Sequence, residues 1–167
     1  MNGPRCVLVG APGAGKSTVG QLLAAALGVS LRDTDQDVSA LVGKPIPDIF
    51  VDEGEPFFRE REHEAVLAAL QSDAVVALGG GAVLDPRTRA ALSGHPVIYL
   101  SVELTDALRR VGMGAGRPLL AINPRATLKY LLDQRRPLYL EVAAHTVVTD
   151  GKTAEAVTQE VRELLAF

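Results

Sequence analysis

Short apolar runs and longer segments with helical periodicity alternate along this chain. Four runs are almost continuously apolar and rich in β-branched residues, and a weaker one lies at 29–31, so each predicts a buried strand. The four stronger runs are Cys6–Val9, Ala74–Leu78, Val97–Leu100 and Thr146–Val148. Apolar residues three or four positions apart predict helices at 18–27, 57–70, 88–92, 104–111, 126–132 and 154–165.

This alternation predicts an α/β fold, a three-layer sandwich in which helices cover both faces of a parallel sheet. Ligands of such folds bind outside the carboxyl ends of the strands. Two segments interrupt the alternation. The segment at about 35–70 is helical throughout and too long for one crossover helix, so it predicts an inserted subdomain. The segment at about 112–124 begins with glycines that arginines flank, which is typical of a mobile lid over phosphates.

Composition narrows the class of protein. A length of 167 residues predicts a single domain over 1–167, and a formal net charge of −3 argues against a broad nucleic-acid surface. The chain has one cysteine, Cys6, so it forms no internal disulfide. No signal-peptide pattern and no apolar stretch of membrane-spanning length is visible. We therefore expect a cytoplasmic protein, a monomer, with no nucleic-acid or membrane partner.

The most specific motif is a glycine-rich loop between the first strand and the first helix. The segment Gly10–Ser17 reads GAPGAGKS and fits the phosphate-binding loop pattern. Backbone N–H groups and the positive end of a helix dipole would converge on one point there. Lys16 adds a mobile cation for the outer phosphates of a nucleotide, and the Ser17 hydroxyl can coordinate Mg²⁺. The loop itself leaves open what happens to the phosphate.

Two carboxylates follow the weak second strand, in Arg32-Asp33-Thr34-Asp35. Residues i and i+2 at the end of a strand project to the same side, so Asp33 and Asp35 are expected to meet near the phosphates. One could hold Mg²⁺ through water, and the other could accept the proton of a substrate hydroxyl. The alternative is that one of them only caps the next helix.

Three further groups suit an anionic substrate. Arg59 and Glu62 are three positions apart on a helix, so they can pair and fix the guanidinium, although a solvated charged face is the alternative. Gly79–Gly81 end a strand, where glycines allow unusual dihedrals and a close approach of backbone to ligand. Arg135 and Arg136 follow the helix expected at 126–132, and since neighbours cannot share a helix face, one of them is expected to enter a site.

Together these pieces resemble the shikimate kinase family, over nearly the whole chain. The order and spacing of several short motifs carry the resemblance. They are Asp33-Thr34-Asp35, Ile49-Phe50, Gly54-Glu55, Phe58-Arg59 with Glu62, Leu78-Gly79-Gly80-Gly81-Ala82, Arg117-Pro118-Leu119-Leu120, and Arg135 with Pro137 and Tyr139. The resemblance implies a nucleoside-monophosphate-kinase-like fold with a five-stranded parallel sheet. It also implies transfer of the γ-phosphoryl group of ATP to the 3-hydroxyl of shikimate, a step towards aromatic amino acids.

The resemblance also implies roles on the acceptor side. Arg59 and Arg135 would bind the carboxylate of shikimate. Asp35 would bind the ring hydroxyls and is the candidate base, and Gly80 and Gly81 would offer backbone donors.

On the donor side, the resemblance places Asp33 near Mg²⁺ with Ser17, Arg117 at the phosphates and Arg110 beside the adenine. Lys16, Asp35 and Arg117 are the expected catalytic residues. ATP would also contact the loop and the start of the helix, at Gly13, Ala14, Gly15, Lys16, Ser17 and Thr18.

Two alternatives stay open. One is a related small-metabolite kinase, which would use gluconate or a nucleoside monophosphate as acceptor. The other is a non-catalytic module that binds ATP or shikimate for regulation. The joint presence of Lys16, Ser17, Asp33, Asp35 and Arg117 speaks against a pure binder, which has no need of the complete set.

Overall fold

The structure, a computed structural model, describes residues 3–111 and 123–167. The strands of the described part form one five-stranded sheet in the order β2-β3-β1-β4-β5, and every neighbouring pair is parallel. Their bounds are β1 Cys6–Val9, β2 Ser30–Asp33, β3 Ala74–Ala77, β4 Val97–Ser101 and β5 His145–Val148. All five expected strands are therefore confirmed, with ends that differ by one or two residues.

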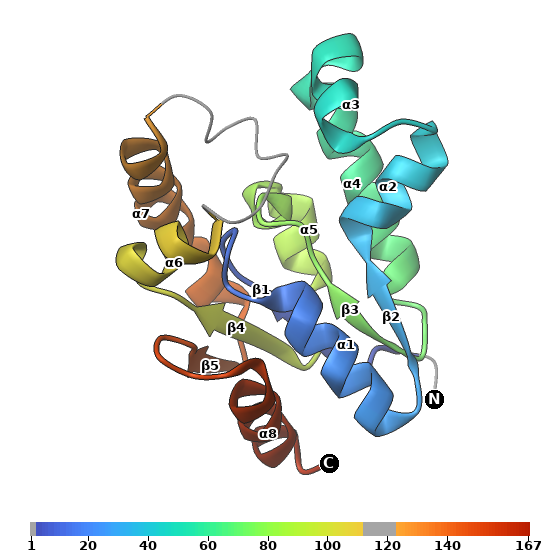
Figure 1. Cartoon of the computed structure of the whole chain (residues 1–167). Helices are drawn as coiled ribbons and strands as arrows, with labels where there is room; N and C mark the ends of the chain where they lie inside the picture. The colour runs from blue at the N-terminus through green and yellow to red at the C-terminus, as the bar shows by residue number, and fades with distance from the viewer. Residues whose placement is uncertain (1–2, 112–122) are drawn as a thin grey trace.

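Helices cover both faces of the sheet, which confirms the three-layer α/β prediction. In Figure 1, α1 and α8 lie side by side in front of the sheet, and α5 and α7 lie behind it. The bounds of these elements and of the short helices near them are α1 Lys16–Leu27, η1 Ala82–Leu84, α5 Pro86–Ala91, α6 Leu104–Val111, α7 Pro124–Val142 and α8 Ala154–Leu165.

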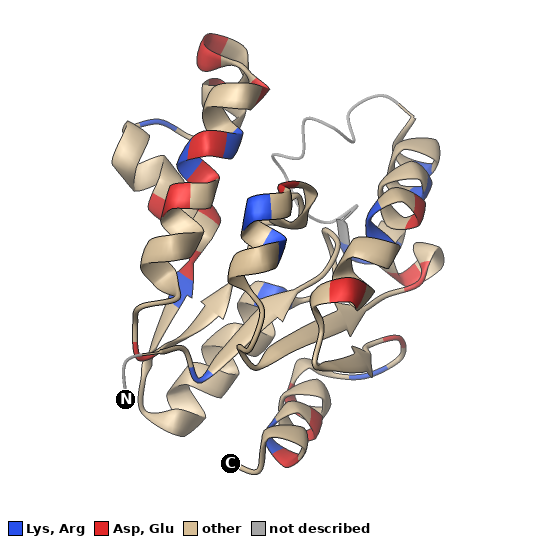
Figure 2. Ribbon diagram, turned by 180° about the vertical axis from the view of Figure 1, so that it is seen from behind, with Lys and Arg blue, Asp and Glu red and all other residues tan. Residues whose placement is uncertain are grey.

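The strands in the middle of the sheet carry no charged residues. Strands β1 and β3 are fully buried, as their unbroken apolar sequences require. Figure 2 shows that the charged residues gather on the helices and the connecting segments, while β1, β3 and β4 carry none. The charged groups of a site must therefore come from the ends of the strands and from the helices.

Between β2 and β3 the chain forms three helices: α2 Thr34–Val42, α3 Ile46–Glu53 and α4 Glu55–Ala69. This confirms that 35–70 is helical. The helices enclose a small core of their own, built on Val38, Ile49, Phe58 and Ala65. Figure 1 shows them standing above the carboxyl edge of the sheet, on the side of β2 and β3. The expected lid, by contrast, lies almost wholly outside the described residues.

Helix α7 is much longer than expected. The periodicity predicts a helix at 126–132 with the arginine pair after it, but α7 continues to Val142 with Pro137 inside it. A proline removes the hydrogen bond to the carbonyl four residues earlier, here Asp133. Both Asp133 and Pro137 are exposed, so water can satisfy that carbonyl and the helix continues. Arg135 is therefore a helical residue rather than a loop residue.

Within the described ranges, no helix is both long enough and apolar enough to cross a lipid bilayer.

Candidate active site

The phosphate-binding loop lies at the carboxyl end of the central strand β1 and leads into α1. Gly15 is the N-cap of α1 with φ +92°, a left-handed conformation that suits glycine. The ammonium group of Lys16 folds back over the loop and donates to the carbonyl oxygens of Gly10 at 2.6 Å and Ala11 at 3.2 Å. The loop thus has the strand–turn–helix context that its sequence predicts.

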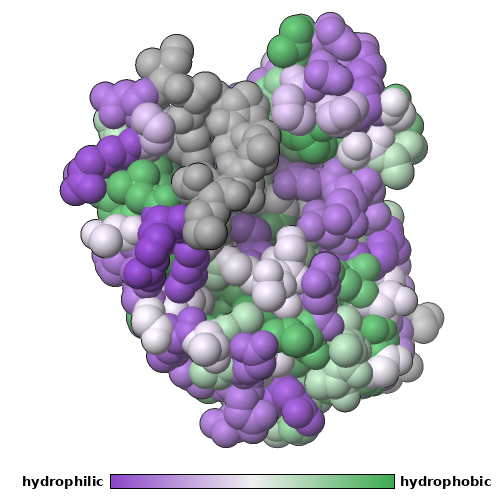
Figure 3. Space-filling view, viewed as in Figure 1, coloured by the Kyte–Doolittle hydropathy of each residue, from purple (hydrophilic) through white to green (hydrophobic). Residues whose placement is uncertain are grey.

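A cavity of about 450 Å³ opens beside this loop, at the carboxyl edge of the sheet. Its described lining is Pro12, Gly13, Gly15, Lys16, Ser17, Thr18, Asp33, Asp35, Ala77, Leu78, Gly80 and Arg110. Figure 3 shows hydrophilic surface beside a hollow on this face of the molecule. Most of the expected donor-side residues therefore share one cavity with Asp35. Ala14 is buried within the loop, and Arg117 lies outside the described residues.

The two aspartates reach the cavity by a different route from the one expected. Asp33 is the last residue of β2, but Asp35 already belongs to the first turn of α2, so the strand argument for their common side is wrong. Asp33 Oδ1 caps α2 by accepting from the N–H groups of Asp35 and Gln36, as the capping alternative predicts. Its second oxygen, Oδ2, accepts from the Ser17 hydroxyl at 3.2 Å. Asp33 therefore caps the helix and also faces the phosphate loop.

Thr34, between the aspartates, has a role that the sequence analysis missed. Its side chain is fully buried, and Oγ1 accepts from the N–H of Gly79 at 3.1 Å. Strands β2 and β3 pair as far as Asp33 and Ala77. Beyond this point β2 turns into α2, and the Thr34 hydroxyl supplies the acceptor that the next residue of a strand would have offered. The motif was visible in the sequence, but the partner of its hydroxyl was not.

The triple glycine at the end of β3 provides close approach, as predicted, but no left-handed backbone conformation. None of Gly79, Gly80 and Gly81 has a positive φ. A methyl group at Gly79 would overlap the carboxylates of Asp35 and Glu62, and one at Gly81 would lie 2.5 Å from Arg59 Nη1. Because these glycines have no side chains, the charged groups of Asp35, Glu62 and Arg59 can lie against the loop.

Arg59 and Glu62 form a buried ion pair on α4, so the alternative of a solvated face is wrong. Arg59 Nη1 donates to Glu62 Oε1 at 2.8 Å, and the Glu62 side chain is only 3% exposed. The guanidinium also lies 5.2 Å from the ring centre of Phe58 and 6.0 Å from that of Phe50. Burial raises the pKa of Glu62 to about 7, against the opposing effect of Arg59. These contacts fix the direction of the arginine.

Helix α7 supplies a second arginine at the same loop. Arg135 is 5% exposed and lies beside Gly80, while Arg136 points outward with 40% of its side chain exposed. This confirms that only one of the pair turns inward. Tyr139, one turn later, donates its hydroxyl to the carbonyl oxygen of Gly80 at 2.6 Å, and burial raises its pKa to about 12. Tyr139 thereby holds α7 against the glycine loop.

Arg110, at the end of α6, lines the cavity beside the phosphate loop. Its Nη1 donates to the carbonyl oxygen of Gly13 at 3.1 Å and to Thr149 Oγ1 at 3.0 Å, and its Nη2 donates to the Thr149 carbonyl at 3.0 Å. The arginine thus joins the phosphate loop to the segment after β5. Thr149 belongs to no recognisable sequence motif, so its contact with Arg110 could not be predicted from the sequence.

The residues expected at a metal suit Mg²⁺. Ser17 and Asp33 present oxygen atoms on the cavity wall beside the phosphate loop, and Mg²⁺ prefers oxygen ligands from few protein groups together with substrate phosphates. In the part of the chain that the structure describes, no cluster of three or more His, Cys, Asp or Glu side chains could hold a metal by itself.

Comparison with known proteins agrees with this geometry. A family model described as "Shikimate kinase" matches residues 12–166. The "Shikimate kinase" of Salinispora arenicola is 68% identical over 98% of both chains. That of Streptomyces coelicolor is 54% identical over 95% of this chain and 94% of its own.

Solved structures give the same result. The structure of "Shikimate kinase from Acinetobacter baumannii in complex with shikimate" superposes with a TM-score of 0.93 at 37% identity, covering 99% of this chain and 94% of its own. A gluconokinase from Sinorhizobium meliloti has a TM-score of 0.63 at 20% identity, covering 96% of this chain and 90% of its own, a likeness of fold alone. The fold, the family model and the relatives agree, and the chain belongs to the shikimate kinase family of ATP-dependent kinases.

Proposed function

We propose that this chain transfers the γ-phosphoryl group of ATP to the 3-hydroxyl of shikimate, giving shikimate 3-phosphate and ADP. One observation carries the proposal: the phosphate loop and the group of Asp35, Arg59 and Arg135 converge on the loop at Gly79–Gly81. A phosphate donor and a hydroxylated carboxylic acid would meet there. The Acinetobacter baumannii shikimate kinase, whose structure is a complex with shikimate, supports this acceptor.

The proposed donor side is the loop and the start of α1, at Gly13, Ala14, Gly15, Lys16, Ser17 and Thr18. Lys16 already lies over the loop, so a short movement from the Gly10 and Ala11 carbonyls would bring its charge to the phosphates. Arg110 lies on the adenine side. Ser17 and Asp33 would hold Mg²⁺, which neutralises phosphate charge when it is bound.

The proposed acceptor side matches the chemical groups of shikimate, one carboxylate and three hydroxyls. Arg59 and Arg135 would bind the carboxylate as charge-assisted hydrogen-bond donors. The N–H groups of Gly80 and Gly81 form no hydrogen bond within the described part of the chain, so they suit a ligand oxygen. The helical insert at about 35–70 would then be the acceptor-binding part of a single kinase domain.

Asp35 is the proposed base. It lines the cavity between the phosphate loop and the glycine loop, where the hydroxyl that attacks the γ-phosphorus would lie. Its carboxylate would accept the proton of that hydroxyl as the oxygen–phosphorus bond forms. The catalytic role expected of Arg117 rests on the sequence, because this residue lies outside the described ranges.

The localisation, the oligomeric state and the partners of the enzyme are also proposals. We propose that the enzyme is a cytoplasmic monomer without nucleic-acid or membrane partners. The net charge of −3 argues against a broad nucleic-acid surface.

An acceptor assay tests the reaction. Purified protein with Mg-ATP should release ADP with shikimate, and not with gluconate or AMP. ³¹P and ¹H NMR of the product should place the phosphate on the oxygen at carbon 3. Equal ADP release with all three acceptors would refute the proposed acceptor, and phosphate on another oxygen would refute the proposed position.

A further inference from the structure

We propose that Glu62 takes up a proton from the solvent when a carboxylate substrate binds to Arg59. The inference rests on the proposed function, because it takes the acceptor carboxylate to bind at Arg59. The proposed reaction gives Glu62 no chemical role. The O–H bond forms on a Glu62 carboxylate oxygen, and no other bond of the protein changes.

The geometry makes Arg59 a shared partner. One guanidinium nitrogen, Nη1, already donates to Glu62 Oε1 at 2.8 Å. The guanidinium also lies against Gly81, within the loop where the acceptor is proposed to bind. The carboxylate of the substrate would contact the guanidinium of Arg59 as well. Glu62 and the substrate carboxylate would then share Arg59 in a largely buried place, with Arg135 as the second arginine that acts on both.

In the protein itself, the carboxylate of Asp35 already lies near that of Glu62 at the glycine loop. Glu62 Oε2 and Asp35 Oδ1 both lie so close to Gly79 that a methyl group on this residue would overlap each of them. The substrate would bring a third negative charge to this group. A buried charge without full compensation is costly, and a carboxyl group avoids that cost by binding a proton.

The charged groups that act on Glu62 come from three helices in the described part of the chain. They are Arg59 on its own helix α4, Asp35 on α2 and Arg135 on α7. Of the other charges nearby, Glu55 also pairs with Arg59, at 3.8 Å, while several on the insert and on α5 have partners of their own. Lys44 pairs with Asp52 and Glu53, Arg87 pairs with Asp85 and Glu60, and His63 contacts Thr88.

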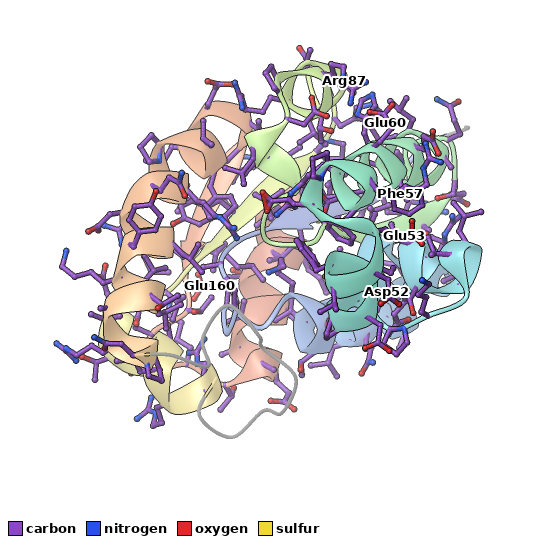
Figure 4. The ribbon with its side chains drawn as sticks, turned by 90° about the horizontal axis from the view of Figure 1, so that it is seen from above. Asp52, Glu53, Phe57, Glu60, Arg87 and Glu160 are labelled. Carbon is purple, nitrogen blue, oxygen red and sulfur yellow. The ribbon has the colours of Figure 1, made fainter. Side chains whose placement is uncertain are left out.

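Figure 4 shows Asp52 and Glu53 on α3 and Glu60 beside Arg87, and all four side chains are exposed. Glu62 therefore depends on the two arginines that the acceptor would also engage. Its pKa of about 7 in the free protein, raised by burial, means that it is partly charged near neutral pH. An arriving carboxylate would raise that pKa further and complete the protonation.

Isothermal titration calorimetry of the full chain with shikimate tests this. The titration is repeated at pH 7 in buffers of different ionisation enthalpy, which gives the number of protons taken up. We expect an uptake of a sizeable fraction of a proton per shikimate bound. We also expect the dissociation constant to rise with pH above 7, by up to about tenfold per pH unit for one linked proton.

Two variants locate the proton. Glu62→Gln should abolish the uptake. Glu55→Gln is the matched control, because Glu55 also pairs with Arg59, at 3.8 Å, but is 58% exposed, so the uptake should persist. Zero uptake by the wild type, or full uptake by Glu62→Gln, would overturn the proposal.

A site-specific measurement covers the case in which Glu62→Gln does not fold or bind. The ¹³C chemical shift of the Glu62 carboxyl in the wild type should move toward the protonated value when shikimate is added. An unchanged shift with shikimate bound would overturn the proposal. Failure of shikimate to bind at all would instead count against the proposed function, so the two failures are distinguishable.

Discussion

The addition of one methyl group at Gly81 tests the acceptor side of the site directly. A Cβ atom there would lie 2.5 Å from Arg59 Nη1 and 2.6 Å from Nη2. The φ of Gly81 is −98°, which alanine adopts without strain. The three atoms nearest to that methyl group all belong to Arg59, so Gly81→Ala acts first on this arginine.

The size of the effect follows from how Arg59 is held. Carbon and nitrogen atoms pack at about 3.5 Å, so the guanidinium must move by about 1 Å. It can do so only by disturbing its 2.8 Å bond to Glu62 and its contact with the Phe58 ring. A misplacement of about 1 Å in a positioning group costs about 100-fold in rate, or about 3 kcal/mol. We expect kcat/KM for shikimate to fall by that factor, with the KM for ATP unchanged.

Steady-state rates of ADP release measure this, with Gly80→Ala as the matched control. The nearest atoms to a methyl group at Gly80 lie at 3.4 Å, which is ordinary contact, so its effect should be smaller. The decisive step is a double-mutant cycle with Arg59→Ala. If the methyl group acts through Arg59, adding Gly81→Ala to Arg59→Ala costs little. A full 100-fold loss in that background would refute the reasoning.

Three further predictions concern the same loop. Thr34→Val leaves the Gly79 N–H without its acceptor and should lower the free energy of unfolding by about 1–3 kcal/mol, whereas Thr34→Ser should not; equal urea midpoints for the two variants would contradict this. Asp35→Asn should lower turnover far more than it weakens ATP binding, and a collapse of ATP affinity in a nucleotide titration would instead assign Asp35 to the metal. Glu62, with its pKa raised from 4.5 to about 7, contributes stability that is present below pH 4.5 and lost as the pH rises through 7. In denaturant unfolding, the free energy of unfolding of Glu62→Gln should therefore rise by about 3 kcal/mol relative to that of the wild type between pH 4.5 and 8. A pH-independent difference between the two proteins would contradict the raised pKa of Glu62.

Much of the fold could be predicted because its signals are local. A strand buried on both faces must be apolar throughout, so the runs that became β1, β3 and β4 stand out from the sequence alone. The phosphate loop is equally local, because its glycines, Lys16 and Ser17 act through the backbone next to them. The prediction of the loop, the sheet and the helical insert therefore needed no knowledge of distant contacts.

The features that the sequence left wrong or open depend on burial and on contacts with other elements. The end of β2 depends on Thr34, whose hydroxyl replaces a strand partner for Gly79, a residue far away in the sequence. The length of α7 depends on the exposure of Pro137, which periodicity does not reveal. The burial of Glu62 depends on the glycines of β3 coming close to α4. For Thr34 and Glu62 the deciding partner belongs to another element, whereas for Pro137 it is the solvent.

The same long-range contacts explain how this fold can serve different acceptors. The proposed donor site is the phosphate loop between β1 and α1, while the proposed acceptor groups come from α2, α4 and α7. Charged side chains from these three helices come together at Gly79–Gly81, where the absence of side chains leaves room for Asp35, Glu62 and Arg59. A change of acceptor would therefore require new side chains on those helices and a compatible glycine loop, with the donor site left intact. The gluconokinase at 20% identity shares the fold alone.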